Sequence, residues 1–208
     1  MSIGIGVTTY NRPKIKALWL ENYLKYTKGD NIKLYIAEDT DLDRKGIAAR
    51  KNECLRALRD CDYIFLFDDD CFPIKKGWME FFINSGFKHL LYLNNEHYAL
   101  GFNGDGIVYA NCGGVFMFMT KECIDAVGAF DEKYGMYGFE HADYSIRIHK
   151  AGITVHQYTS LTDTHKYLYS LDYAENNTSS ITDAEKQIHV KNNWDKFFKE
   201  PKTTYINL

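Results

Sequence analysis

Three consecutive aspartates follow a strongly apolar segment, and their type and spacing suit them to chemistry. Tyr63 to Phe67 is aromatic or aliphatic throughout, which is typical of a strand buried on both faces of a parallel sheet. Asp68, Asp69 and Asp70 then fall at its carboxyl end, where open α/β sheets bind ligands. Neighbouring carboxylates repel each other, and Mg²⁺ and Mn²⁺ prefer oxygen ligands. The run therefore predicts a metal site for substrate phosphates rather than a solvated acidic turn.

A second group of charged side chains is predicted on a helix over Phe139 to Lys150. Glu140, Asp143 and Arg147 stand at i, i+3 and i+7 and so share one helical face. Glu140 lies near the helix N-terminus, where a carboxylate is favoured. The glycine-rich approach favours an active-site face over an exposed acidic face that carries an Asp143–Arg147 pair.

The first half of the chain alternates strands and helices, which predicts an α/β fold with a parallel sheet and right-handed crossovers. Gly4 and Gly6 lie inside the first strand rather than after it, which excludes a dinucleotide-binding fingerprint. Strands are predicted at Ile3 to Thr9, Ile32 to Ala37 and Tyr63 to Phe67, and helices at Pro13 to Tyr26 and Gly46 to Arg59.

The second half is less regular. Residues 94–111 and 175–180 are rich in glycine or polar residues and are interpreted as loops. Helices are predicted to begin near Trp78, to follow Thr120 as the N-cap, and to span Asp183 to Phe198. Further strands are predicted at His89 to Leu93, Val115 to Met119 and Ile153 to Tyr158.

Composition excludes several classes of protein. The formal net charge is -3 with Lys and Arg scattered along the chain, so no nucleic-acid-binding face is expected. The 5 cysteines include no Cys-x-x-Cys pair, which favours buried free thiols in a reducing compartment over a zinc site. The start is not typical of a secretory signal, and no segment is long and apolar enough to span a bilayer. We expect a soluble, cytoplasmic protein.

Several segments, in this order, resemble the GT-A glycosyltransferases, particularly the family-2-like enzymes. The resemblance extends to about His165. The compact length also resembles glycosyltransferases of large algal (chlorella-type) viruses, or one domain of a longer protein. The matching segments are Gly6 to Pro13, Gly46 to Asn52, Tyr63 to Asp70, Val127 to Glu132, and Tyr137 to Asp143 followed by Arg147.

The resemblance implies a single GT-A (Rossmann-like) α/β domain over residues 1–208, with a mostly parallel central sheet flanked by helices. The aspartate run is then the DXD motif at the end of a central strand. Residues 1–70 would bind the nucleotide, residues 71–165 the sugar and acceptor, and residues 166–208 would form a C-terminal extension with a helix. The implied reaction is metal-dependent transfer of a hexose from a nucleotide diphosphate sugar, expected to be UDP-linked, to a hydroxyl of a glycan acceptor.

The resemblance also implies roles in donor binding. Asp70 would ligate Mn²⁺ or Mg²⁺, with His165 as the final ligand, since imidazole suits Mn²⁺. His156, the competing histidine, lies in a predicted strand. The remaining donor roles are nucleoside contact by Thr9, Tyr10 and Arg12, a hydrogen bond from the base to Asp39, ribose binding by Asp68 with Asp69 beside it, and contact of Arg50 with the diphosphate or the aspartates.

In the resembling enzymes the acidic residue at Glu140 contacts the acceptor hydroxyl or the donor sugar. Inverting members carry an Asp base directly after it, where this chain has His141. His141, Glu140 and Asp143 are the candidate bases. Alternatively, the departing phosphate takes the proton in a retaining enzyme, whose Glu-x-x-Glu pair Glu140 and Asp143 resemble. The missing Asp favours retention.

Two other functions are weighed against this one. A sugar-nucleotide nucleotidyltransferase shares the layout and the metal carboxylates, but it normally has a Gly-rich basic loop after the first strand, which Thr8 to Pro13 is not. A non-catalytic nucleotide- or glycan-binding module is the second alternative. The presence of Asp70, Glu140 and His165 argues against it.

Overall fold

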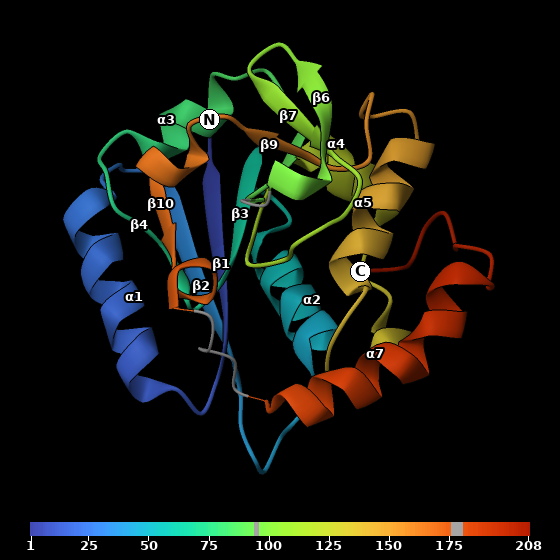
Figure 1. The fold of residues 1–208 in the computed structure, drawn as a ribbon. Helices are drawn as coiled ribbons and strands as arrows, with labels where there is room; N and C mark the ends of the chain where they lie inside the picture. The colour runs from blue at the N-terminus through green and yellow to red at the C-terminus, as the bar shows by residue number, and fades with distance from the viewer. Residues whose placement is uncertain (94–95, 176–180) are drawn as a thin grey trace.

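The computed structural model describes residues 1–93, 96–175 and 181–208 (Figure 1). Its centre is a five-stranded sheet in the order β2-β1-β3-β8-β5. β1 pairs in parallel with β2 and β3, whereas β8 runs antiparallel to β3 and β5. The predicted mostly parallel sheet is therefore confirmed, with one antiparallel strand. The bounds are β1 Ile3–Tyr10, β2 Ile32–Asp39, β3 Tyr63–Asp68, β5 His89–Leu91 and β8 Phe116–Thr120.

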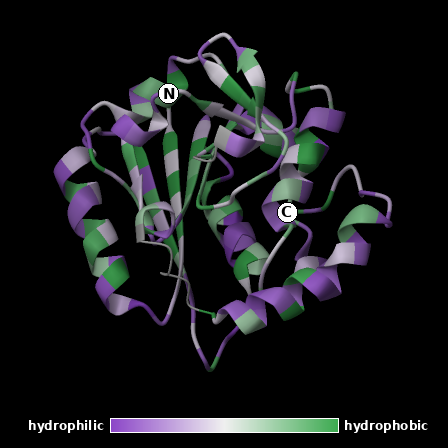
Figure 2. Cartoon of the chain, viewed as in Figure 1, coloured by the Kyte–Doolittle hydropathy of each residue, from purple (hydrophilic) through white to green (hydrophobic). Residues whose placement is uncertain are grey.

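Helices cover both faces of this sheet, as Figure 1 shows for α1 (Pro13–Tyr26) and α2 (Ile47–Leu58). Side chains alternate along β3, so Phe65 and Phe67 join a core with α1, and Ile64 and Leu66 join a second core with α2. Both cores exclude water almost completely, which explains why β3 is apolar throughout. In Figure 2 the strands of the central sheet are accordingly mostly hydrophobic, while hydrophobic and hydrophilic residues alternate along the helices.

Gly6 shows why glycines occur inside β1. A Cβ atom at this position would lie 2.7 Å from the Cβ of Cys54 and 2.7 Å from Leu66 Cδ2. The glycine therefore lets α2 pack closely against the sheet, which is a structural role.

The predicted loop over residues 94–111 is wrong for most of its length. A short 3-10 helix (η1, Glu96–Tyr98) leads into a hairpin of β6 (Ala99–Asn103) and β7 (Gly106–Tyr109); residues 94 and 95 lie outside the described ranges. Gly104, at φ 57°, takes the left-handed conformation in the turn. The Asn-Gly pair at 103–104 is a hairpin signal that the glycine-rich composition obscured.

The predicted strand Ile153 to Tyr158 is also wrong, because that segment has no partner strand. β7 is short and pairs instead with β9 (Thr159–Leu161), which completes a three-stranded sheet. A further strand, β10 (Leu168–Ser170), pairs with β4 (Cys71–Pro73) directly after the aspartates. Sequence patterns did not predict either of these short strands.

The remaining helices are α3 (Trp78–Ile83), α4 (Lys121–Val127), α5 (Glu140–Lys150), α6 (Leu171–Glu175) and α7 (Asp183–Phe198). α5 begins one residue later than predicted, since Phe139 is left-handed at φ 74° and packs its ring on Phe197 at 4.6 Å. Thr120 occupies the N-cap of α4 without a side-chain cap bond. α7 has its predicted bounds, and residues 176–180 of the predicted polar loop lie outside the described residues.

A late segment of the chain is joined to the α4–α5 junction. The amide of Ala129 donates to the carbonyl of Ile206 at 2.8 Å, and the amide of Ile206 donates to the carbonyl of Val127 at 3.1 Å. Gly128 bridges in parallel to Ile206, and a Cβ there would lie 1.8 Å from the Ile206 carbonyl oxygen. Glycine is therefore required at this contact.

Within the described ranges, no helix has the length and apolarity needed to cross a membrane.

Candidate active site

A cleft of about 280 Å³ opens where the carboxyl ends of β1, β2 and β3 approach α5, α6 and the start of α7. The parallel strands bring together side chains that are far apart in sequence. Asp69, Asp143 and His165 were predicted as site residues but do not line the cleft. The predicted residues that do line it are Thr9, Tyr10, Arg12, Asp39, Arg50, Asp68, Asp70, Glu140 and His141.

The aspartate run separates into two outer residues and one inner residue. Asp69 is fully buried, and its carboxylate accepts hydrogen bonds from the Thr9 hydroxyl at 2.5 Å and from Arg12. Asp68 accepts from the Thr8 hydroxyl at 3.0 Å, and Arg12 Nη1 donates to Asp70 Oδ2 at 3.1 Å. Asp69, predicted to bind the donor, thus fixes the turn beneath the cleft, because its side chain is directed inward between its two neighbours.

Asp68 and Asp70 fit a divalent cation. Burial and the nearby Asp68 carboxylate raise the pKa of Asp70, so a cation beside it would relieve a real electrostatic cost. Within the described part of the chain, no three His, Cys, Asp or Glu side chains form a complete ligand set. Two carboxylates that need substrate oxygens to complete the coordination are typical of a site for Mg²⁺ or Mn²⁺ with a bound diphosphate.

Lys51 takes the role that the sequence assigned to Arg50. Its side chain is only 1% exposed, and its Nζ lies 3.3 Å from Glu140 Oε1 and 3.7 Å from Asp68 Oδ1. Burial opposes the charge, but Asp68 and Glu140 together raise the pKa of Lys51. The ammonium therefore connects the aspartate run to α5. A charged residue among the apolar positions of α2 was the signal that sequence reasoning missed.

Arg50 is committed to the loop between β2 and α2. Its Nε and Nη2 donate to Asp39 Oδ1 at 3.1 Å and 3.0 Å, and its Nη1 donates to Glu53 at 2.8 Å. Asp39 also accepts from the amides of Lys45 and Gly46. Burial works against the Arg50 charge, yet these carboxylates raise its pKa. Asp39 and Arg50 line the cleft but order its loop, so their predicted contacts with base and diphosphate gain no support.

Glu140 and His141 form a close pair at the start of α5. His141 Nδ1 lies 2.9 Å from Glu140 Oε1, which Lys51 also approaches. Burial disfavours the Glu140 charge, but His141 and Lys51 outweigh this and hold the pKa of Glu140 well below its usual range. The Glu140 carboxylate in turn raises the pKa of His141 to about 10, against the effect of burial. The pair is therefore carboxylate and imidazolium at neutral pH.

This charge state changes the expected roles. A protonated His141 cannot accept the acceptor's proton, so the structure does not support His141 as the base. Glu140 Oε2 is buried, and within the described ranges it has no hydrogen-bond partner. Because this oxygen is buried as well as unpartnered within those ranges, a substrate hydroxyl can reach it only when the surrounding side chains move. Gly114 makes room for the pair, since a Cβ there would lie 2.5 Å from His141 Nδ1.

Asp143 does not join Glu140 at the cleft. Its carboxylate accepts from Arg147 Nε at 2.9 Å and from the Tyr134 hydroxyl at 3.2 Å, and both ion-pair partners are about 1% exposed. The predicted Asp143–Arg147 pair exists, but it is buried rather than exposed. Asp143 is thus withdrawn from the cleft because its oxygens secure α5 to the core.

His165 lies in the short 3-10 helix Thr164–Lys166, is exposed, and is absent from the cleft lining. Its neighbours Asp163 and Tyr167 line a different surface hollow, beside α3. The prediction that His165 is a metal ligand therefore gains no support from this arrangement.

Sequence reasoning missed several cleft residues. The Arg44 guanidinium stacks on the Tyr10 ring at 4.3 Å. Tyr137 reaches the cleft from the segment before α5. Only tertiary packing places these segments beside the aspartates, so no local signal identified them. The others are Thr8, Gly46, Ile47, Cys112, Gly113, Gly114, Val115, Met136, Gly138, Asp172, Tyr173, Ile181 and Lys186.

Comparison with known proteins gives this geometry a context. Residues 101–170, which include the start of α5, match a family described as the N-terminal domain of galactosyltransferase. A protein of Acanthamoeba polyphaga mimivirus, described as an uncharacterized glycosyltransferase, is 26% identical over 187 residues. That alignment covers 71% of this chain and 73% of the viral protein.

Solved structures share the fold. TarS of S. aureus superposes with a TM-score of 0.63 over 96% of this chain at 12% identity, and the chain spans 44% of TarS. The catalytic domain of Drosophila beta1,4galactosyltransferase 7 gives 0.53 over 89% of this chain and 78% of its own, at 16% identity. The mannosyltransferase PcManGT of Pyrobaculum calidifontis gives 0.52 over 70% of this chain and 51% of its own, at 12% identity.

The fold is thus that of the GT-A glycosyltransferases. Together with the family match and the viral relative, it identifies the chain as an enzyme of the glycosyltransferase class.

Proposed function

We propose that this enzyme transfers a hexose from a UDP-linked sugar to a hydroxyl of a glycan acceptor, with Mn²⁺ or Mg²⁺ at Asp68 and Asp70. The S. aureus TarS fragment 1–349 was solved with UDP-GlcNAc, and PcManGT with GDP-Man and Mn²⁺. These neighbours support a nucleotide-sugar donor and a metal for this chain. The choice of uracil rests on the sequence resemblance.

One observation carries the proposal. Asp68, Asp70 and Glu140 line a single cleft, the buried Lys51 ammonium lies between Asp68 and Glu140, and one Glu140 oxygen lacks a hydrogen-bond partner among the described residues. A transferase needs a site for the leaving diphosphate and a separate acceptor for the hydroxyl proton or a sugar hydroxyl. This arrangement provides both within reach of one bound substrate.

Different residues of the chain have different roles in the proposed reaction. A bound cation would neutralise charge on the departing diphosphate as a Lewis acid. Arg12 and Thr9 hold the turn that aims Asp68 and Asp70 into the cleft. Lys51 and His141 keep Glu140 ionised, and Glu140 Oε2 accepts a hydrogen bond from a sugar or acceptor hydroxyl. Tyr10 and Arg44 offer a flat stacked surface at the nucleoside end.

Stereochemistry depends on which group takes the acceptor's proton. The pairing of Glu140 with Asp143, one of two grounds for retention, is lost because Asp143 is sealed in the core. The second ground is strengthened, since a Glu140 with a lowered pKa is a weak base and His141 is already protonated. Retention, with the leaving phosphate as the proton acceptor, remains our proposal. The anomeric configuration of the product, read by NMR against the donor, decides it.

Donor and metal binding are tested by calorimetry of UDP and GDP with and without Mn²⁺. We expect UDP to bind the native protein with Mn²⁺ and much more weakly without it. Asp70→Asn should remove the metal dependence, whereas Asp60→Asn, an exposed turn residue, should match the native protein. Equal affinity with and without metal would refute the metal site.

Turnover is a separate test, because a non-catalytic binding module would also bind UDP. A radiolabelled UDP-sugar, incubated with a panel of glycans and Mn²⁺, should lose its sugar to an acceptor or to water. Synthesis of the sugar nucleotide from UTP and a sugar phosphate would instead favour a nucleotidyltransferase.

Source and setting are proposals of the same kind. The mimivirus relative supports origin in a large virus, though not a particular host. The free thiols Cys54, Cys61, Cys71 and Cys123, all buried, fit the reducing cytoplasm. We also propose that residues 1–208 act as one catalytic domain, either alone or in a longer protein.

A further inference from the structure

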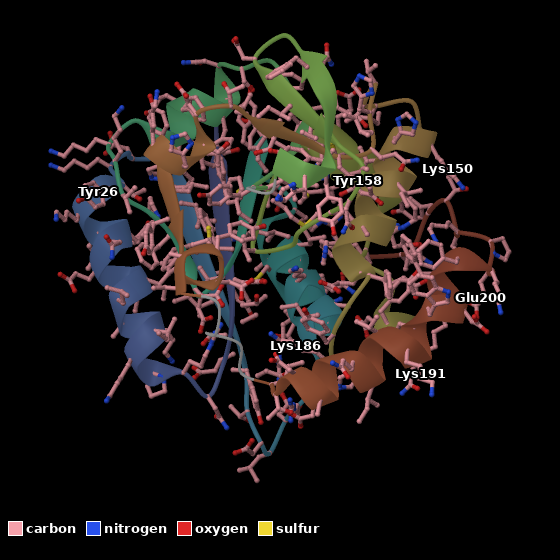
Figure 3. All side chains as sticks on the ribbon, viewed as in Figure 1. Tyr26, Lys150, Tyr158, Lys186, Lys191 and Glu200 are labelled. Carbon is pink, nitrogen blue, oxygen red and sulfur yellow. The ribbon has the colours of Figure 1, made fainter. Side chains whose placement is uncertain are left out.

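Part of the cleft lining comes from α7 and the residues just before it. Ile181 and Lys186 line the cleft together with Arg44. Lys186 lies in the second turn of α7, at the end of that helix nearest the cleft, whereas Lys191 lies further along it (Figure 3). The capping box of Thr182 and Glu185 fixes where the helix begins. The position of Lys186 is therefore set by the fold.

Among the described residues, the arginine and lysine side chains that line the cleft differ in how firmly they are held. Arg12 is bonded to Asp69 and Asp70, and Arg50 to Asp39 and Glu53. Arg44 lies over the Tyr10 ring. Lys186 pairs with Asp183 at 3.6 Å, and the Asp183 side chain is 83% exposed. A solvated pair of this kind contributes little, so the Lys186 ammonium can exchange it for a bound anion at low cost.

Tyr137 places this end of α7 close to the reacting groups. Its side chain lines the cleft, and its pKa is raised by burial and then by Glu140, Asp172, Asp68 and Asp183. Asp183, the partner of Lys186, and Asp68 of the aspartate run thus both act on the same cleft residue.

We propose that Lys186 binds the diphosphate of the donor, so that α7 completes the nucleotide-sugar site. This inference rests on the proposed function. The inner wall is rich in carboxylates, namely Asp68, Asp70 and Glu140, and a diphosphate brings further negative charge. Arg12, Lys51 and His141 already offset the carboxylates, so the charge that the diphosphate adds is left to the cation and to the Lys186 ammonium. Because α7 follows residues 101–170, this contact lies outside the part of the chain that matches the galactosyltransferase family.

The test compares Lys186→Ala with Lys191→Ala, an exposed lysine of the same helix. UDP and uridine are titrated by calorimetry in the presence of Mn²⁺. Loss of one charge-assisted contact should weaken UDP binding by Lys186→Ala about tenfold and leave uridine binding unchanged. Lys186→Arg should recover most of the loss, and Lys191→Ala should match the native protein. Melting temperatures within error of the native value show that the variants fold.

The outcomes separate the two proposals. If the native protein binds neither UDP nor GDP with Mn²⁺, the proposed function is overturned and this inference with it. If the native protein binds UDP and Lys186→Ala binds it equally well, only the inference is overturned. A parallel loss of UDP and uridine affinity also overturns it, because the effect would then be on cleft shape rather than on a phosphate contact.

Discussion

Helix α5 carries two buried carboxylates one turn apart, and they meet opposite surroundings. At its first residue, Glu140 faces the cleft with Lys51 and His141 on one oxygen and no partner within the described ranges on the other. Asp143 faces the core, where Arg147 and Tyr134 occupy both oxygens. Burial is nearly equal, at 3% and 1% exposed. The exposed fraction therefore does not distinguish these two carboxylates, whereas an oxygen without a hydrogen-bond partner does.

The largest expected effect comes from the cleft end of this helix. Glu140→Gln keeps the shape and removes the charge, so turnover should fall about 10²–10⁴-fold while UDP affinity stays within a few-fold. Steady-state rates and UDP calorimetry on the same preparation measure this split. An unchanged rate would show that Glu140, like Asp143, has a structural role only, and the proposed contrast between the two carboxylates would be wrong.

Substitution of Asp143, the carboxylate of α5 that faces the core, should lower the stability of the protein. Asp143→Asn leaves the Arg147 guanidinium buried without its counter-charge, so the free energy of unfolding should fall by about 3–5 kcal/mol. Asp125→Asn is the matched control, because Asp125 pairs with Lys121 at the same helical spacing on an exposed surface. Its cost should be below about 1 kcal/mol. Urea denaturation of both variants measures the difference, and equal costs would contradict the structural role of Asp143.

His89, which contacts α5, and His141, which lies in it, should change the stability of the protein with pH in opposite directions. His89 is buried against Ser145 and the Phe118 carbonyl, and burial lowers its pKa to about 4. Only the unfolded chain then takes up the proton, so stability from this site is lost as pH falls from about 6.5 to about 4. His141 has its folded pKa raised to about 10, so its contribution is complete below about 6.5 and is lost as pH rises towards 10.

Unfolding free energies of His89→Gln and His141→Asn across this range check both signs. Relative to the native protein, His89→Gln should gain on the order of 2 kcal/mol on acidification from pH 7 to pH 5. The disadvantage of His141→Asn should shrink steadily as pH rises from 7 to 9 and be lost above about pH 10. Two profiles of the same sign would show that the surroundings of the two histidines are not opposite.

The smallest expected effect tests how the cleft end is positioned. Gly114→Ala places a methyl group against the His141 ring and should displace it from Glu140, which lowers turnover about tenfold. Gly29→Ala, at an exposed position near the flexible Ile32 side chain, is the control and should be neutral. Initial rates at saturating donor measure both, and a fully active Gly114→Ala would show that the His141 position is not critical.

Local signals predicted much of the fold. Pro13 suited the first turn of α1, and α7 has the bounds predicted for it, Asp183 to Phe198. The apolar run before Asp68 predicted β3 correctly. The insertion of β8 antiparallel between β3 and β5, and the pairing of β9 with β7, depend on long-range contacts that a single sequence does not display.

The sequence predicted which segments form the candidate site, but it did not predict which of their side chains face the cleft. The aspartate run and the start of α5 do meet at the cleft. Which member of each charged cluster faces it was not readable, so Asp69 and Asp143 turned out to be structural, and Lys51 rather than Arg50 reaches the aspartates. Side chains of adjacent residues point in different directions, by about 100° in a helix and to opposite faces in a strand. An error of one residue therefore changes which side chain is expected to face the cleft.

The pairing of Ile206 with the α4–α5 junction has a consequence for biosynthesis. Residues 127–129 leave the ribosome well before Ile206, and their contact closes a loop of about 80 residues, which is slow to form. Arg147 donates to the carbonyls of Val127 and Ala129 at 2.8 Å and 2.7 Å, and the Tyr144 hydroxyl donates to the Gly128 carbonyl at 3.0 Å. Arg147 and Tyr144 of α5 can therefore hold residues 127–129 before Ile206 joins them.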